Sequence, residues 1–188
     1  MNAPGSNWGA TAAERAMPLP CDGLAGGPHV TCHRAISVAA PVAVMFRRLC
    51  QLRVAPYSYD LLDNFGRRSP IELTPGLDVL RPGQRFMRIF ELVSFGETSF
   101  TLRAARTFVT YAVLPEGDGS RILVRVLFQS GTGLGRALAQ LLIAGDLVMM
   151  RKQLLTLRDL AERDAVAVSS RPGGGSRGAS PGPLRPIA

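Results

Sequence analysis

Apolar and polar residues alternate along five segments of the chain, and this period of two predicts β-strands at 29–38, 86–95, 99–105, 108–114 and 121–130. The last four follow one another at hairpin spacing, and the connection at 115–120 reads PEGDGS, which is typical of a turn. We therefore expect antiparallel pairing. On the final strand, Ile122, Val124, Val126 and Phe128 share one face, which predicts an apolar sheet surface.

Three further segments are expected to be helical, and in two of them apolar residues recur at spacings of three and four. Pro41 suits the first turn of a helix that ends before Pro56, and a second, short helical stretch follows at 57–66. The longest helix is expected from about Leu134 to Asp164, with an apolar stripe at Ile143, Leu147, Met150, Leu154, Leu157 and Ala161. Polar residues interrupt its apolar stretch, so it falls short of the roughly 18 residues of a transmembrane span. We expect it to cover the sheet.

Composition sets the expected domain limits. Residues 1–28 and 165–188 are dominated by Gly, Pro, Ala and Ser, which bury too little apolar area to offset the entropy of ordering. Both ends are therefore expected to be disordered, and 29–164 is expected to form one domain. The first segment lacks the basic start and apolar run of a secretory signal, which favours a cytoplasmic protein.

Charge and cysteine content argue against several classes of partner. The net charge is +8, but residues 165–188 contribute three of these charges and the rest are scattered, so nucleic-acid binding is not expected. Three cysteines without CxxC spacing fit reduced thiols, and two histidines add little, so no metal site is expected. The glycines at 131–135 do not complete a dinucleotide-binding motif, so no cofactor is expected.

The segment 57–68 concentrates polar and aromatic groups. Its hydroxyl, carboxylate, amide and guanidinium groups could line the mouth of a cavity. They could equally fix the conformation of the loop through caps and ion pairs, and the sequence leaves both interpretations open.

Two carboxylates outside this segment are also candidates. Asp146 lies about 40° from the edge of the apolar stripe at roughly 100° per residue, so it faces a cavity or pairs with a nearby arginine. Glu91 shares a strand face with Ile89 and Val93. It is buried with a raised pKa if that face points inward, and it is solvated if Phe90 and Leu92 point inward.

The order of these elements resembles the START-like helix-grip fold, also called the SRPBCC or polyketide cyclase/dehydrase-like superfamily. ISVAAPVAVMFRRLCQLR resembles its first strand and helix, YSYDLLDNFGRRSP resembles a segment of uncharacterised actinobacterial members, and GDLVMMRKQLLTLRDLAE is similar to its closing helix. The resemblance covers about 29–164. It implies an α+β fold in which a curved antiparallel sheet wraps around a long C-terminal helix. It also implies one further strand, within 69–74 or at Gln84.

Members of this superfamily bind lipids, sterols, hormones or polyketides between the sheet and the long helix, and only some are enzymes. We therefore expect a small hydrophobic ligand and a monomer or homodimer. The expected ligand-binding residues are Tyr57, Tyr59, Asp60, Tyr111, Phe128, Ile143, Leu147, Met150 and Leu154. The first alternative is a polyketide cyclase or dehydratase with Asp60, Asp146 or Glu91 as its acid or base. The second is a partner-binding domain that uses the arginines of the C-terminal tail.

Overall fold

The computed structural model describes residues 5–58, 68–129 and 134–170, without the side chains of 134–144 and 146. Its strands form one sheet in the order β1-β2-β7-β6-β5-β4-β3. Their bounds are β1 (Asn7–Trp8), β2 (His29–Val38), β3 (Arg85–Phe86), β4 (Phe90–Phe95), β5 (Ser99–Ala104), β6 (Thr107–Glu116) and β7 (Gly119–Gln129). The helices are α1 (Ala12–Ala16), α2 (Val42–Cys50), the 3-10 turn η1 (Gln51–Arg53) and α4 (Leu134–Ser169).

The strand pairing follows the hairpin prediction. Strands β4, β5, β6 and β7 pair antiparallel with their sequence neighbours, and β7 then pairs antiparallel with β2 from His29↔Gln129 to Val38↔Ser120. At the β6–β7 turn Gly117 adopts a φ of 55°, a conformation that glycine accepts at little cost. The short strand β1 is the exception, because it runs parallel to β2.

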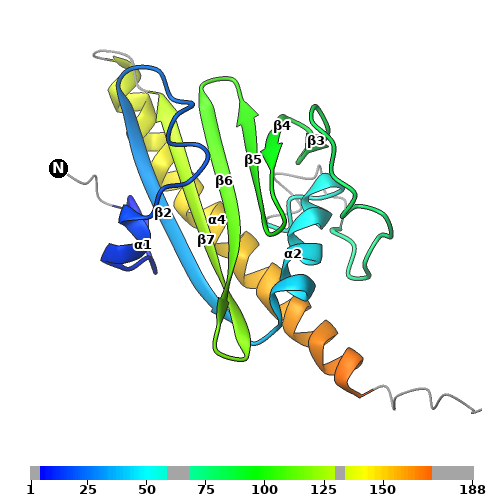
Figure 1. Cartoon of the computed structure of the whole chain (residues 1–188). Helices are drawn as coiled ribbons and strands as arrows, with labels where there is room; N and C mark the ends of the chain where they lie inside the picture. The colour runs from blue at the N-terminus through cyan, green and yellow to red at the C-terminus, as the bar shows by residue number, and fades with distance from the viewer. Residues whose placement is uncertain (1–4, 59–67, 130–133, 171–188) are drawn as a thin grey trace, which may run out of the picture.

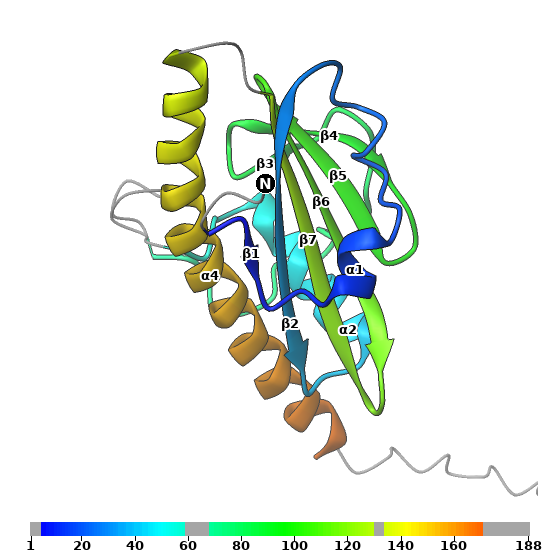
Figure 2. The same ribbon diagram turned by 90° about the vertical axis from the view of Figure 1, so that its left-hand side faces the viewer.

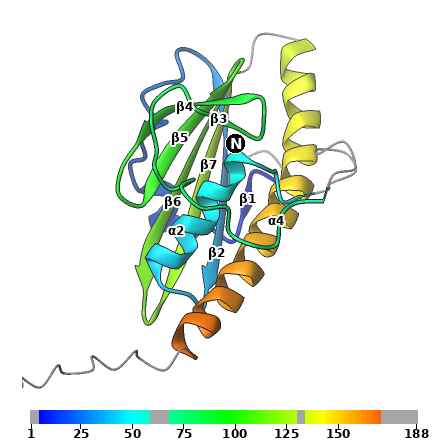
Figure 3. The same ribbon diagram turned by 90° about the vertical axis from the view of Figure 1, so that its right-hand side faces the viewer.

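The helices α2 and α4 lie on one face of the sheet, and α1 lies on the opposite face (Figures 1 and 2). Figure 3 shows α2 beside the C-terminal half of α4. The core between these layers joins the inward rows of β6 and β7 to buried residues of α4: Val109, Tyr111, Val113, Ile122, Val124, Val126, Leu154, Leu157 and Ala161. Each fully buried leucine contributes about 2 kcal/mol to folding. The predicted α+β helix-grip fold is confirmed.

The predicted strand at 86–95 is interrupted in the structure. Met87 and Arg88 have φ angles of 46° and 67°, which a strand cannot accommodate. The chain therefore turns back, and β3 pairs antiparallel with β4 through Arg85↔Glu91 and Phe86↔Phe90. This supplies the further strand beside Gln84, whereas no strand forms in 69–74.

The expectation of a disordered first segment is wrong for residues 5–28. Its helix α1 begins with a capping box between Thr11 and Glu14. Arg121 pairs with Glu14, and Arg125 contacts Asp22 at 2.6 Å. Composition missed this order because it carries no information about ion pairs or strand pairing with the sheet, and both hold the segment here. We call residues 5–28 the N-terminal strap.

The C-terminal boundary also differs from the prediction. The helix α4 continues to Ser169, beyond the expected end at Asp164. Residues 1–4, the short helix expected at 57–66 (apart from 57 and 58) and the tail from 171 to 188 lie outside the described residues. In the part of the chain that the structure describes, no helix is long and apolar enough to cross a membrane.

Candidate functional site

The helix α4 makes three different contacts along its length. Its inner stripe, Met150, Leu154, Leu157 and Ala161, packs into the core as the spacing of four, three and four predicted. Its strap flank, Leu147 and Arg151, faces the N-terminal strap. Its pocket flank, Lys152, Thr156 and Leu160, lines a cavity beside the segments around Tyr57 and Ile71. Residues four apart lie on one side of a helix, so each flank is a continuous strip.

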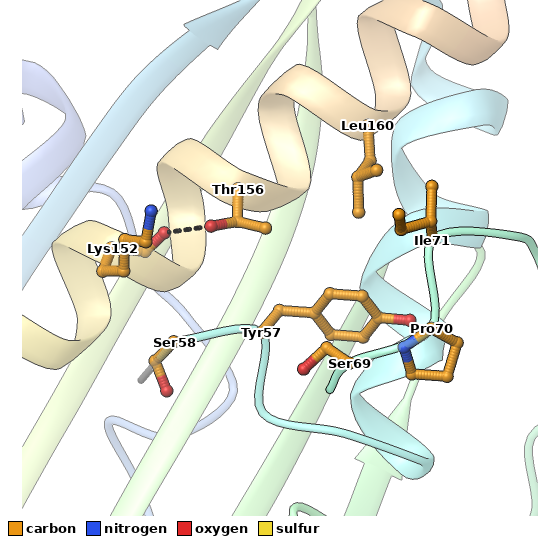
Figure 4. Close-up of a pocket in the computed structure, with 8 residues that line it drawn as sticks. All are labelled: Tyr57, Ser58, Ser69, Pro70, Ile71, Lys152, Thr156 and Leu160. Atoms are coloured by element: carbon orange, nitrogen blue, oxygen red, sulfur yellow. Dashed lines mark hydrogen bonds between the residues drawn. The ribbon is translucent and has the colours of Figure 1, made fainter. Parts of the chain in front are cut away.

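The cavity on the pocket flank has a volume of about 230 Å³. Its described lining consists of Tyr57, Ser58, Ser69, Pro70, Ile71, Lys152, Thr156 and Leu160. Figure 4 shows the Tyr57 ring extending toward Pro70, with Ile71 and Leu160 near one another beside it. The lining combines an apolar part with hydroxyl groups and one ammonium group. Such a mixture holds the body of a ligand by burial and orients its polar end.

Tyr57 lines one wall of the cavity, and its backbone conformation is strained. Its φ is 57°, in the left-handed region that residues other than glycine rarely adopt, and its side chain is only 2% exposed. Strain of this kind costs about 1–3 kcal/mol and persists only where the surroundings hold the residue firmly. Positions of this type cluster at binding and catalytic sites, which makes Tyr57 an informative lining residue.

A buried glutamine holds this strained segment against α4. The Gln153 Nε2 group donates to the Pro56 carbonyl oxygen at 2.7 Å, and the Tyr111 hydroxyl donates to Gln153 Oε1 at 2.8 Å. The same Nε2 atom lies 3.3 Å from the sulfur of Met87, another residue of positive φ. Gln153 therefore joins the sheet, the helix and two strained turns at the base of the pocket flank.

A buried arginine fixes the other end of the cavity. The Arg48 guanidinium, 1% exposed, donates two hydrogen bonds to Asp164, at 2.5 and 2.7 Å. A third nitrogen donates to the Ile71 carbonyl oxygen at 2.9 Å. A bidentate pair of this kind has a defined geometry. Arg48 thus positions the segment containing Ile71 relative to both α2 and α4.

The predicted ligand-binding residues separate into four groups. Tyr57 lines the cavity, and Leu147 lies on the strap flank beside Gly5. The buried residues Tyr111, Phe128, Met150 and Leu154 belong to the packed core, where the Phe86, Phe100 and Tyr111 rings have centroid distances of 4.9 and 5.2 Å. Tyr59 and Asp60 lie outside the described residues, as does the side chain of Ile143.

Within the described residues, the cavity lies at another place than the predicted one, which also included Ile143. Side chains pack the interface between the sheet and residues 150–161 of α4, and the described cavity lies beside the helix instead. The residues that the sequence interpretation missed are Lys152, Thr156 and Leu160. Their spacing of four was a usable signal, since it places them on one strip next to the apolar stripe.

Of the three candidate carboxylates, Glu91 is the one whose side chain the structure describes, and it does not line this cavity. Leu92 points inward, so Glu91 lies on the solvated side of β4 and pairs with Arg103 at 3.3 Å. This outcome matches the solvated alternative for Glu91. The side chains of Asp60 and Asp146 lie outside the described residues. Among the described lining residues, Lys152 is the one that carries a charge at neutral pH.

A second hollow of about 420 Å³ lies beside α2. Its lining is Val42, Ala43, Phe46, Arg47, Asp78, Glu97 and Thr98. Arg47 and Asp78 form an exposed ion pair across it at 3.9 Å, and its lining residues have ordinary backbone angles. The cavity on the pocket flank differs from this hollow because its wall includes Tyr57, whose side chain is buried and whose backbone is strained.

The thiols and carboxylates elsewhere offer no metal site within the described residues. All three cysteines are free and buried, as expected for reduced thiols. Burial raises the pKa of Cys50 to about 12, so this thiol is neutral and unreactive at physiological pH. Burial, followed by the nearby arginines Arg125, Arg15 and Arg34, lowers the pKa of His33 to about 4.

Comparisons with known proteins give matches of structure rather than of sequence. No family model matches the chain, and no curated protein matches it. The solution structure of the KanY protein is 16% identical and covers 72% of this chain and 99% of its own, with a TM-score of 0.47. The protein NE0264 from Nitrosomonas europaea is 14% identical, and the match covers 71% of this chain and 95% of NE0264, with a TM-score of 0.44. The protein Ara h 8.0201 is 13% identical, and the match covers 74% of this chain and 99% of Ara h 8.0201, with a TM-score of 0.42.

These likenesses concern the arrangement of helices and strands. That arrangement is defined by the elements of the chain itself: a sheet of mostly antiparallel strands, α2, and the long closing helix α4. The chain has a helix-grip fold, in agreement with the fold that its sequence resemblance implied.

Proposed function

We propose that this protein binds a small hydrophobic ligand in the cavity between the pocket flank of α4 and the segments around Tyr57 and Ile71. The observation that carries the proposal is the lining itself. A buried tyrosine held at a φ of 57° meets apolar groups of Ile71 and Leu160 around a volume of about 230 Å³. The fold would supply rigid walls, and burial of apolar ligand surface would supply the affinity.

The described part of the cavity is small. Pockets for drug-sized ligands enclose about 300–1,000 Å³. A volume of about 230 Å³ fits a small molecule or one part of a longer chain.

Ligand binding is favoured over the alternative of a cyclase or dehydratase. General acid–base catalysis needs a group that exchanges a proton near neutral pH, placed within hydrogen-bonding distance of the substrate. The described lining contributes hydroxyl groups and Lys152, and Glu91 is engaged with Arg103 elsewhere. No specific observation on the described residues favours the enzyme or the tail-dependent partner-binding alternative.

Native mass spectrometry of the full-length chain tests the proposal, followed by extraction and identification of any small molecule that copurifies. Leu160→Trp should fill the cavity and reduce the bound fraction by about tenfold, because several favourable contacts of the ligand are lost. Val166→Trp is the matched control, because Val166 lies on the same helix and is 67% exposed. A bound molecule that both variants retain equally would contradict the proposed site.

A further inference from the structure

We infer that the ligand of this cavity is an anionic amphiphile, a molecule with a carboxylate group at one end and an apolar body at the other. The carboxylate would bind the Lys152 ammonium group, and the apolar body would lie toward Leu160 and Ile71. This inference rests on the proposed function and adds the chemical class of the ligand.

The pocket flank is itself polar at one end and apolar at the other. Lys152, Thr156 and Leu160 follow one another at intervals of one helical turn. At 1.5 Å per residue they extend over roughly 12 Å along the helix axis. Ser58 and Ser69 add hydroxyl groups to the lining, and Pro70 and Ile71 add apolar surface. A strip with a charged end and an apolar end fits an amphiphile better than a uniformly apolar molecule.

The charge on the pocket flank also differs from the charges elsewhere on α4. Arg151 stacks over Trp8 with its guanidinium carbon 5.4 Å from the ring centroid, and Arg158 and Arg163 contact carboxylates. Lys152 has no carboxylate partner among the described residues, and no described carboxylate lines the cavity. The described lining thus presents one positive charge that an anionic ligand group would neutralise.

Lysine suits this role chemically. Lys152 is the only lysine in a chain whose other basic side chains, apart from two histidines, are arginines. Its ammonium is a compact charge on a flexible stem, so it can follow a single carboxylate without the planar two-point geometry that arginine favours. A hydrogen bond between an ammonium and a carboxylate is shorter and stronger than one between neutral groups.

Calorimetric titration of the full-length protein with octanoate and with octanol tests the inference, because the two probes share a chain length and differ in the charge of the end group. We expect octanoate to bind about fivefold more tightly than octanol, since an ion pair at an exposed lysine contributes up to about 1 kcal/mol. Lys152→Gln should remove the preference, so that the ratio of the two dissociation constants falls to about one. Lys152→Arg should retain most of it.

Each other outcome has a defined meaning. Equal binding of both probes would overturn the anionic class and leave the proposed function standing. A preference for octanoate that survives Lys152→Gln would also overturn the inference, because another group would then bind the carboxylate. Binding of neither probe would overturn both the inference and the proposed function for ligands of this size.

Discussion

The two flanks of α4 show two ways of holding the same helix. On the strap flank, β1 extends the sheet beyond β2, Trp8 stacks on Arg151, and the backbone of Gly5 approaches Leu147 closely enough that an added Cβ would lie 3.3 Å from its side chain. On the pocket flank, the segments around Tyr57 and Ile71 are tied to the helix by Gln153 and Arg48 and leave a cavity between these two points.

The difference lies in where the interactions fall. Backbone pairing of β1 with β2 and the stacking of Trp8 on Arg151 act along the strap flank. On the pocket flank the strong contacts sit at the two ends, and strained residues such as Tyr57 lie between them. A cavity survives where a few rigid contacts span a gap, because close packing elsewhere prevents the walls from collapsing.

The largest effect is expected from breaking the tie at the base of the pocket flank. Gln153→Leu removes the hydrogen bonds that Gln153 makes with the Tyr111 hydroxyl and the Pro56 carbonyl oxygen, both in a buried setting. The loss of these two hydrogen bonds should cost about 3 kcal/mol of unfolding free energy, measured by urea denaturation. Ligand binding should weaken as well, because Pro56 precedes the strained Tyr57.

Gln129→Leu is the matched control for this variant. The Gln129 amide makes an exposed contact with the Gly26 carbonyl oxygen at 3.4 Å, so its loss should change stability by less than about 0.5 kcal/mol. Equal destabilisation by the two variants would show that Gln153 does not anchor the pocket flank.

A smaller effect is expected on the strap flank. Gly9 has a φ of 77°, and an added Cβ would lie 2.1 Å from the Ala35 carbonyl oxygen. Gly9→Ala should therefore detach β1 at a cost of about 2 kcal/mol. Trp8 is the only tryptophan, so the detachment should appear as a red shift of tryptophan emission. Gly23→Ala, where an added Cβ meets no atom within 4 Å, should leave the emission unchanged.

The smallest effect concerns the pH dependence of the strap. Hydrogen bonds from Arg121, and then from Thr11, lower the pKa of Glu14 from 4.5 to about 2. A carboxyl group whose pKa is lower in the folded state stabilises the fold above about pH 4.5 and loses that contribution as the pH falls through about 2. Glu14→Gln should flatten this part of the stability curve, as followed by denaturation at pH 6, 4 and 2.5. An unchanged slope would mean that Glu14 is not held by Arg121 in solution.

The fold was more predictable than the site because different physical signals specify them. Burial of one face produces both the alternation of apolar and polar residues along the strands and the apolar stripe from Met150 to Ala161. The structure contains these strands and this stripe. The strap was missed because its order depends on ion pairs between distant residues, such as Arg125 and Asp22. Sequence composition reports apolar content and carries no information about such pairs.

The cavity depends on features that local patterning does not encode. The left-handed conformation of Tyr57 is imposed by its surroundings, and no local residue type predicted it. The spacing of Lys152, Thr156 and Leu160 was visible, but it became meaningful only when the segments around Tyr57 and Ile71 were placed beside it. Tyr57 was identified because aromatic and polar groups crowd its segment.

The most direct test of the account is methyl NMR of the full-length protein labelled at isoleucine and titrated with octanoate. Ile71 lines the cavity, Ile122 is buried in the core, and Ile89 is exposed away from the cavity. We expect the Ile71 methyl signal to shift first and to show a direct contact with the octanoate chain, while the signals of Ile122 and Ile89 remain unchanged. A shift of Ile122 without Ile71 would place the ligand between sheet and helix and would contradict the site proposed here.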